Sequence, residues 1–117
     1  MYIGEISKKT GLSIKAIRLY EEKGLIPTPK RSGRYRVYQE SDVDILLLIK
    51  EAKSFGVTLA QLKSVIVYSN GQVDWAEVQA FLALQRNRIL DEIQSLKDKI
   101  NKIDECANQI NICPLSA

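Results

Sequence analysis

The fold is decided by residues 11–26, GLSIKAIRLYEEKGLI, in which apolar side chains recur at helical spacing between two glycines. Ser13 is a preferred N-cap residue, and Gly24 can end a helix because glycine adopts the left-handed conformation without steric cost. This stretch predicts a helix that begins at Ser13 and stops at Gly24. Residues 3–10 predict a shorter helix before it, which Gly11 ends. Two short helices joined by such a tight turn form a helix-turn-helix.

A small β-hairpin is predicted after this helix pair. Pro27 and Pro29 end the helical region, because proline fixes φ and lacks the backbone N–H. Residues 30–38, KRSGRYRVY, then place aromatic and β-branched residues on both sides of a glycine turn. A hairpin in this position is a wing, so the first part of the chain predicts a winged helix-turn-helix.

Three helix-start signatures follow, each with a capping residue and a partner three positions later. They are residues 41–44, SDVD, residues 58–61, TLAQ, and residues 74–77, DWAE. Gly56 separates the first two of these helices, and residues 69–71, SNG, are expected to form a loop before the third. The middle of the chain is therefore expected to be a helix pair and the last third one long helix, which makes the fold mainly α.

The long helix carries a narrow apolar seam. Its positions follow steps of seven, four and three residues, as in a coiled coil, with Arg86 as an interruption. Such a helix is not stable alone in water, and the rest of the chain is too small to cover it. We therefore expect a homodimer, although a helix folded back on its own domain would also cover the seam. The expected interface residues are Leu82, Ile89, Ile93, Leu96, Ile100 and Ile103.

These features divide the chain into three parts. Residues 1–70 are expected to form the winged head with its helix pair, residues 71–112 the dimerisation helix, and residues 113–117 a C-terminal tail. The longest apolar runs fall far short of the roughly 20 residues that a bilayer requires. The start of the chain has no basic leader before an apolar stretch. We therefore expect a cytoplasmic protein without a membrane partner.

Charge and composition narrow the expected function. The 117 residues hold 17 Lys and Arg, 14 Asp and Glu and no histidine, with a formal net charge of +3. Without imidazole there is no Ser-His-Asp or Cys-His site, so we do not expect an enzyme. Residues 1–38 hold nine basic and three acidic side chains, a balance of +6, whereas residues 39–73 and 74–117 carry −1 and −2. The head is therefore the part suited to a polyanion such as double-stranded DNA.

Candidate DNA contacts lie on the second helix, on the wing and farther along the chain. Lys15 and Arg18 are three residues apart and share a helix face, from which both reach phosphates or base edges of a major groove. Arg18 and Tyr20 could instead take part in packing or in ion pairs. Two such heads on a two-fold axis would bind an inverted repeat. The expected contacts are Lys15, Arg18, Tyr20, the wing residues Arg34, Tyr35 and Arg36, and Lys53.

These motifs together resemble the DNA-binding domain of MerR-family transcription regulators. The resemblance is carried by residues 16–26, AIRLYEEKGLI, and residues 33–38, GRYRVY, and it covers about the first 68 residues. The long helix resembles the antiparallel dimerisation helix of the family in its pattern. The family resemblance implies a homodimer that binds a promoter whose spacer is too long for RNA polymerase. In such proteins an effector leads to bending and untwisting of the DNA, which realigns the promoter elements.

The effector is suggested by two cysteines near the C-terminus. Cys106 and Cys113 have six residues between them, and Pro114 follows. This segment resembles the C-terminal metal-binding loop of copper-type MerR proteins, which implies a soft monovalent ion such as Cu(I) held by two thiolates. A Zn(II) site is not expected, because one chain without histidine does not supply four N or S ligands.

Two other interpretations of these features stay open. In the first, Cys106 and Cys113 form a disulfide, and the protein is a thiol-redox or other non-metal effector-responsive regulator on the same scaffold. In the second, the protein is a coiled-coil adaptor that does not bind DNA, and the basic head binds a protein. Sequence-selective binding to an inverted repeat separates the second interpretation from a regulator.

Overall fold

The computed structural model describes residues 1–112 and divides the chain into two compact units, Met1–Val78 and Gln79–Ala117. The first, which we call the head, contains every element except most of the last helix. In chain order the elements are α1 (Ile3–Thr10), α2 (Ile14–Glu22), β1 (Lys30–Ser32), β2 (Tyr35–Val37), α3 (Glu40–Ser54), α4 (Leu59–Val65), β3 (Tyr68–Ser69), β4 (Gln72–Val73) and α5 (Trp75–Ile112). The expected mainly α fold is confirmed.

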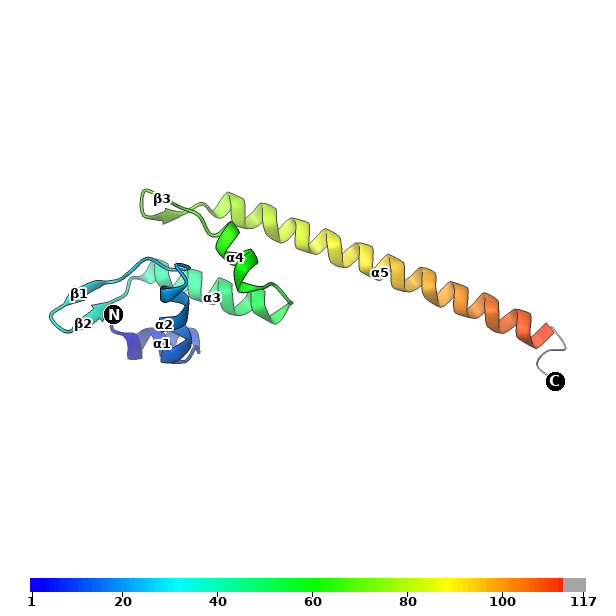
Figure 1. The fold of residues 1–117 in the computed structure, drawn as a ribbon, viewed down its shortest axis with the longest axis horizontal. Helices are drawn as coiled ribbons and strands as arrows, with labels where there is room; N and C mark the ends of the chain where they lie inside the picture. Colours follow the sequence, from blue (N-terminus) through cyan, green and yellow to red (C-terminus); the bar gives the residue numbers. More distant parts are fainter. Residues whose placement is uncertain (113–117) are drawn as a thin grey trace. The chain divides into compact units, whose positions relative to one another are not determined.

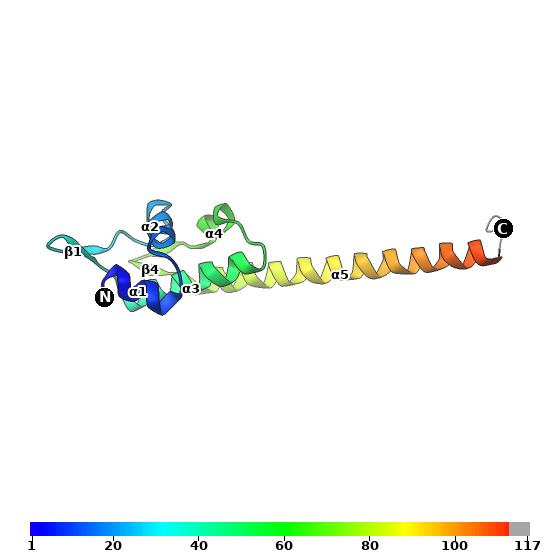
Figure 2. The ribbon, with the colours of Figure 1, turned by 90° about the horizontal axis from the view of Figure 1, so that it is seen from below.

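The helix-turn-helix forms as the glycines and the N-cap predict. Gly11 adopts φ 73°, and its N–H donates to the Ser7 carbonyl oxygen over 2.9 Å, which ends α1. The Ser13 hydroxyl oxygen accepts a hydrogen bond from the N–H of Ala16 over 3.0 Å, which starts α2. Gly24, at φ 78°, follows the end of α2. Figures 1 and 2 show α1 and α2 beside the long α3, with the wing extending away from the helices.

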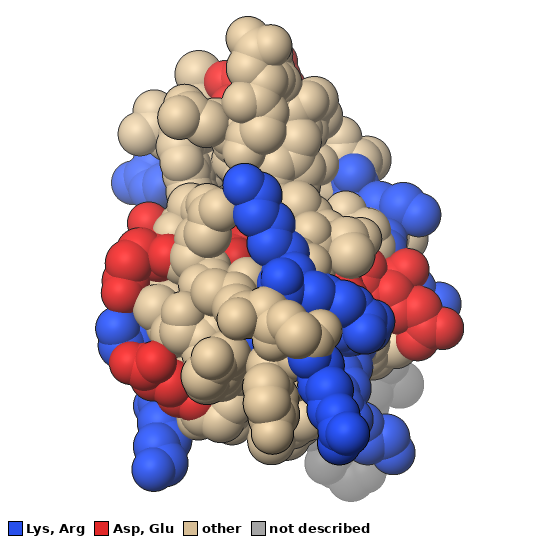
Figure 3. Space-filling model, turned by 90° about the vertical axis from the view of Figure 1, so that its left-hand side faces the viewer, with Lys and Arg blue, Asp and Glu red and all other residues tan. Residues whose placement is uncertain are grey.

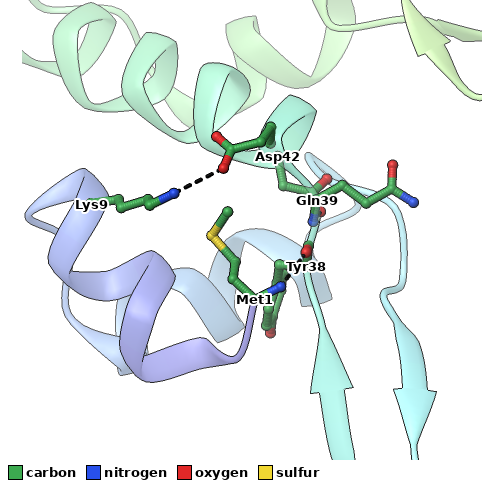
Figure 4. A network of polar contacts seen from close by, with 6 residues as sticks. Met1, Lys9, Tyr38, Gln39 and Asp42 are labelled. Carbon is green, nitrogen blue, oxygen red and sulfur yellow. Dashed lines mark hydrogen bonds and ion pairs between the residues drawn. The ribbon is translucent and has the colours of Figure 1, made fainter.

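The wing is a two-stranded antiparallel hairpin with Gly33 in its turn, at φ 62°. Each strand has three residues, and Ser32 pairs with Tyr35 at the turn end. The N-terminus extends this pairing, because the Met1 amino group donates to the Tyr38 carbonyl over 2.9 Å and the Tyr38 N–H donates back over 2.7 Å (Figure 4). The hairpin alone is too short to be stable in water, so its attachment to the head decides its position.

The start of α3 differs from the expected capping box at residues 41–44. The N-cap is Gln39, and the carboxylate of Asp42 reaches back to accept a hydrogen bond from its N–H over 2.9 Å. The helix therefore begins at Glu40, because Asp42 acts as the third helical residue of the box. The box at α4 is confirmed, since Thr58 and Gln61 cap each other over 2.9 and 3.1 Å.

The expected loop before the last helix is a second hairpin, formed by β3 and β4. Its turn residues Asn70 and Gly71 both have positive φ, 54° and 77°, as an Asn-Gly turn of type I′ requires. Tyr68 attaches this hairpin to the segment after α2, because its hydroxyl donates to the Leu25 carbonyl over 2.8 Å. Burial and the charge of Asp42 raise the pKa of Tyr68 to about 12.

A single apolar core holds the head together. Ile6 of α1, Ile17 of α2 and Leu46 and Ile49 of α3 have no exposed surface, so α3 is the element on which the helix-turn-helix packs. Val78, in the first turn of α5, is also buried. Only the beginning of α5 therefore belongs to this core.

In the second unit α5 continues as one unbroken helix. At about 1.5 Å per residue, its 38 residues span roughly 57 Å. All side chains from residue 86 to residue 110 are exposed, including the expected seam residues in this range. Within residues 1–112, no helix combines the length and the apolar character needed to cross a bilayer.

Candidate nucleic-acid interface

One face of α2 carries the charged side chains and the opposite face packs into the head. Lys15 and Arg18 are exposed, whereas Ile17 is fully buried. The expected pair therefore lies on the solvent side of the second helix of the helix-turn-helix. This is the position from which such a helix contacts the edges of base pairs.

Tyr20 is not on this exposed face. Only 4% of its surface is accessible, because it lies three residues after Ile17 and so shares the core-facing side of α2. Its ring lies beneath the Lys53 ammonium group, with 5.8 Å between Nζ and the ring centroid. Lys53 belongs to the last turn of α3, and its side chain is exposed. This burial argues for a core role of Tyr20 and against the expected direct DNA contact, which stays a prediction.

The wing and α2 together form a pocket of about 430 Å³ that is dominated by arginine side chains. We call it the arginine pocket. A guanidinium group is always charged and presents donors that match a phosphate, so the side chains that line this pocket are chemically suited to an anion. Arg31, which sequence reasoning counted only as part of the overall charge, pairs across the wing with Arg36. The residues that line the arginine pocket are Ile3, Arg18, Arg31, Arg34, Tyr35 and Arg36.

Glu21 fixes one of these arginines. Arg36 Nη1 donates to Glu21 Oε2 over 2.8 Å, and the Tyr38 hydroxyl donates to the same oxygen over 3.2 Å. The Glu21 side chain is only 8% exposed, so it anchors Arg36 from beneath the surface. Burial and the charge of Glu21 raise the pKa of Tyr38, which keeps this hydroxyl protonated as a donor. Arg18, Arg31 and Arg34 are exposed.

An aromatic pair adds a residue that sequence reasoning missed. The rings of Tyr2 and Tyr35 lie 5.4 Å apart between centroids, tilted by 50°, and both side chains are more than half exposed. Tyr2 precedes α1 and Tyr35 begins β2, so no local sequence pattern brings them together.

The space-filling view in Figure 3 shows Lys and Arg side chains crossing one face as a band, with acidic side chains on either side.

The expected metal ligands are only partly described. Cys106 is an exposed free thiol on α5, and Cys113 lies outside the described residues. Within residues 1–112, no three His, Cys, Asp or Glu side chains come together as a metal site. The described donor set, one thiolate, is suited to a soft ion only if a second thiolate joins it.

Comparisons with known proteins agree with this geometry. Residues 1–68 match the model of the family described as MerR HTH family regulatory protein. An "HTH-type transcriptional regulator ZntR homolog" from Haemophilus influenzae is 34% identical over 109 residues, covering 92% of this chain and 74% of the relative. An "HTH-type transcriptional regulator CueR" from Vibrio cholerae is 35% identical over 130 residues, covering 98% and 88%.

Solved structures extend the likeness to the fold. The transcription regulator PbrR691 from Ralstonia metallidurans, solved in complex with lead(II), has a TM-score of 0.52 at 29% identity and covers 90% of this chain and 86% of its own. A MerR-family regulator from Listeria monocytogenes has a TM-score of 0.65 at 23% identity, covering 95% and 86%. With its helix-turn-helix, its wing and these relatives, the chain belongs to the MerR family of helix-turn-helix regulatory proteins and is a DNA-binding transcriptional regulator.

Proposed function

We propose that this regulator binds an inverted-repeat promoter as a homodimer and activates transcription by distorting the DNA in response to a soft metal ion. The observation that carries the DNA part is the arginine pocket beside the exposed face of α2. Lys15 and Arg18 on α2 enter the major groove, while the wing contacts the adjoining backbone. One phosphate group in the pocket would face several guanidinium groups at once.

The proposed contacts divide into two kinds. Arg34 and Arg31 on the wing, together with Tyr35, contact the backbone and set the position of the head, and Lys53 adds an outer contact beyond α2. Arg18 lies at the junction between the helix and the pocket, so it can contact a base edge or a phosphate. Tyr20 contributes indirectly, as a buried support for α2.

The test starts from duplexes that the full chain selects out of randomised DNA. Arg34→Ala should weaken binding to all sequences alike and make the salt dependence shallower by about one counterion per head. Arg18→Ala should weaken the selected operator by about 1–3 kcal/mol, with relaxed selectivity if Arg18 contacts a base. Arg88→Ala on α5 removes the same charge from an exposed site outside the head and serves as the control. Selection of no inverted repeat would contradict this proposal.

The dimer is proposed to form through α5. The side chains of Ile89, Ile93 and Ile100 are between 43% and 57% exposed, which is unfavourable for isoleucine unless a second helix covers them. Their spacing, with Leu82, Leu96 and Ile103, is that of a coiled-coil seam. The similarity to the family's dimerisation helix favours an antiparallel arrangement of two copies.

Sedimentation of two matched variants tests this interface. Ile93→Asp places a charge in the seam and should convert the dimer to monomer at micromolar concentration. Ser95→Asp places the same charge on an exposed position of the same helix outside the seam and should leave the dimer intact. Equal sedimentation of both variants and the unmodified chain would contradict the interface.

The effector is proposed to be Cu(I) or a similar soft ion held by Cys106 and Cys113. Two observations support this. Cys106 is an exposed thiol on α5, and the chain is similar to CueR and to PbrR691, which was solved in complex with lead(II). Two thiolates suit a soft monovalent ion, and binding releases protons. The bound ion would favour the bent and untwisted DNA that RNA polymerase needs. Deforming the duplex costs free energy, and the contacts between protein and DNA offset this cost.

Anaerobic titration with Ag(I) or Cu(I), followed by transcription with RNA polymerase from a selected promoter, tests the effector. About one ion per cysteine pair should bind, and the Cys106→Ser, Cys113→Ser double variant should lose both binding and activation. A response to peroxide without metal would instead support the thiol-redox regulator, and full metal response in the double variant would contradict the site.

A further inference from the structure

A second cavity of the head is not used by the DNA contacts or by the cysteines. It has a volume of about 500 Å³ and lies between residues 27–29, the start of α3, the β3–β4 hairpin and Trp75. Its lining shares no residue with the arginine pocket. This size is within the range of small-molecule sites, roughly 300–1,000 Å³.

The aromatic part of this cavity comes from Trp75 and Tyr68. Trp75, the first residue of α5 and the single tryptophan of the chain, lines the cavity and is 44% exposed. Tyr68 uses its hydroxyl on the Leu25 carbonyl, so its ring is what remains for a ligand. Aromatic rings in a concave site bind flat apolar groups and attract cations through their π faces.

The charged part comes from two carboxylates. Asp42 is only 5% exposed yet lines the cavity, and its Oδ2 accepts the hydrogen bond from Gln39. Among residues 1–112, its other carboxylate oxygen accepts no hydrogen bond and neither oxygen has an ion-pair partner. Burial raises the pKa of Asp42 because it disfavours the ionised form, and a cation bound in the cavity would stabilise that form. Asp44 adds an exposed carboxylate, and Lys30 is the cation among the lining residues.

From this arrangement we propose that the cavity binds an organic cation with a flat apolar body. The cationic group lies against Asp42 and Asp44, and the apolar body lies against Trp75. The walls also carry neutral side-chain oxygens, but their aromatic and proline side chains offer an apolar surface that an organic cation can use and an inorganic cation cannot. The site goes beyond the proposed metal response and does not depend on it.

The location of the cavity gives binding a consequence for the wing. Lys30 and Val37, which pair at the base of the wing, share the cavity with the β3–β4 hairpin that leads into α5. That hairpin has two residues in each strand and little stability of its own. A ligand that contacts both hairpins holds the wing against this segment, so we expect operator affinity to change when the site is filled.

The experiment uses the full chain with N-methylquinolinium as the probe and quinoline as its neutral counterpart. Calorimetry should show saturable binding of the cation and binding at least about tenfold weaker for quinoline, since the charge is lost. Because Trp75 is the single tryptophan, its fluorescence should change with the same saturation curve. Equal affinity for both compounds, or no saturable binding, would overturn the proposal.

Variants separate this site from the others. Asp42→Asn keeps an acceptor for the Gln39 N–H but removes the charge, and it should weaken the cation about tenfold. Asp44→Asn changes an exposed residue and should also weaken binding without a risk to the fold. The Cys106→Ser, Cys113→Ser variant and Arg34→Ala should bind the cation like the unmodified chain. If both Asp variants bind unchanged, the proposal fails even where operator binding succeeds, so the two failures are distinguishable.

Discussion

Arg36 and Glu21 join the wing to the end of the second helix of the helix-turn-helix through a 2.8 Å hydrogen bond between Nη1 and Oε2. The side chain of Glu21 is nearly buried, whereas that of Arg36 is 35% exposed. A carboxylate at a DNA-binding surface lowers its attraction for phosphate. Its value here is geometric, because it holds a short hairpin at a fixed distance from α2.

Replacement of Glu21 should therefore affect specific and non-specific DNA binding in opposite directions. Glu21→Ala removes a negative charge, which strengthens non-specific binding, but it frees Arg36 and the wing, which weakens the selected operator several-fold. Glu22→Ala removes the same charge from an exposed neighbour and should strengthen both kinds of binding slightly. Filter binding to operator and random duplexes measures the ratio. An unchanged ratio for Glu21→Ala would show that the ion pair does not position the wing.

Tyr2 should act as a second support for the wing. Tyr2→Ala removes the ring that packs 5.4 Å from Tyr35, and an aromatic pair of this kind is worth about 0.5–1.5 kcal/mol. We expect operator binding to weaken by a factor of roughly two to ten. Tyr2→Phe keeps the ring and should restore affinity. Loss of affinity in both variants would point to the hydroxyl instead, and no loss in either would contradict the support.

The elements with strong local signals were predictable, and contacts between distant segments were not. Gly11 and Gly24 mark the ends of α1 and α2 because they adopt positive φ, and Ser13 starts α2 through its side-chain cap. These preferences are local and do not depend on the rest of the fold. The Asn70-Gly71 turn also has a strong local signal, but the strands on each side have only two residues and are too short to show the alternation that predicts a strand.

In the candidate site too, some features were predictable from local sequence, whereas others depend on tertiary packing. The basic wing followed from charge and turn residues, and the burial of Tyr20 was within reach, since it lies one helical turn after the apolar Ile17. The pairing of Tyr2 with Tyr35, and of Arg36 with Glu21, depends on how the wing packs on the head. The spacing of residues in a single sequence does not predict which residues of the wing and the head come into contact.

Two glycines, one inside α1 and one at its C-terminal cap, should respond oppositely to alanine. Gly11 has φ 73°, and a Cβ there would lie 2.6 Å from Lys50 Nζ, which donates to the Thr10 carbonyl over 3.1 Å. Gly11→Ala combines backbone strain with displacement of this lysine, so we expect a loss of about 1–3 kcal/mol in the free energy of unfolding. Gly4→Ala meets no atom within 4 Å and should add about 0.5–1 kcal/mol.

Urea denaturation at one fixed protein concentration compares the two variants with the unmodified chain, because a dimer's stability depends on concentration. Gly24→Ala, with φ 78° and open space around the added Cβ, isolates the backbone part of the cost. If Gly11→Ala and Gly24→Ala lose the same free energy, the contact with Lys50 contributes nothing.

Tyr68 should make the protein lose stability in alkaline solution. Burial raises its pKa from the ordinary value of 10 to about 12, so between these values the folded chain keeps a proton that the unfolded chain releases. The folded state then binds more protons, and the free energy of unfolding falls as the pH rises from 10 to 12.

Tyr68→Phe removes this titration together with the hydrogen bond to Leu25. The variant should be less stable near neutral pH but should lose less on going from pH 10 to 12. Urea denaturation across this range measures the slope, and part of it should persist because the pKa of Tyr38 is raised as well. Parallel curves for the variant and the unmodified chain would show that Tyr68 titrates like an exposed tyrosine and that its hydroxyl does not hold the β3–β4 hairpin to the segment after α2.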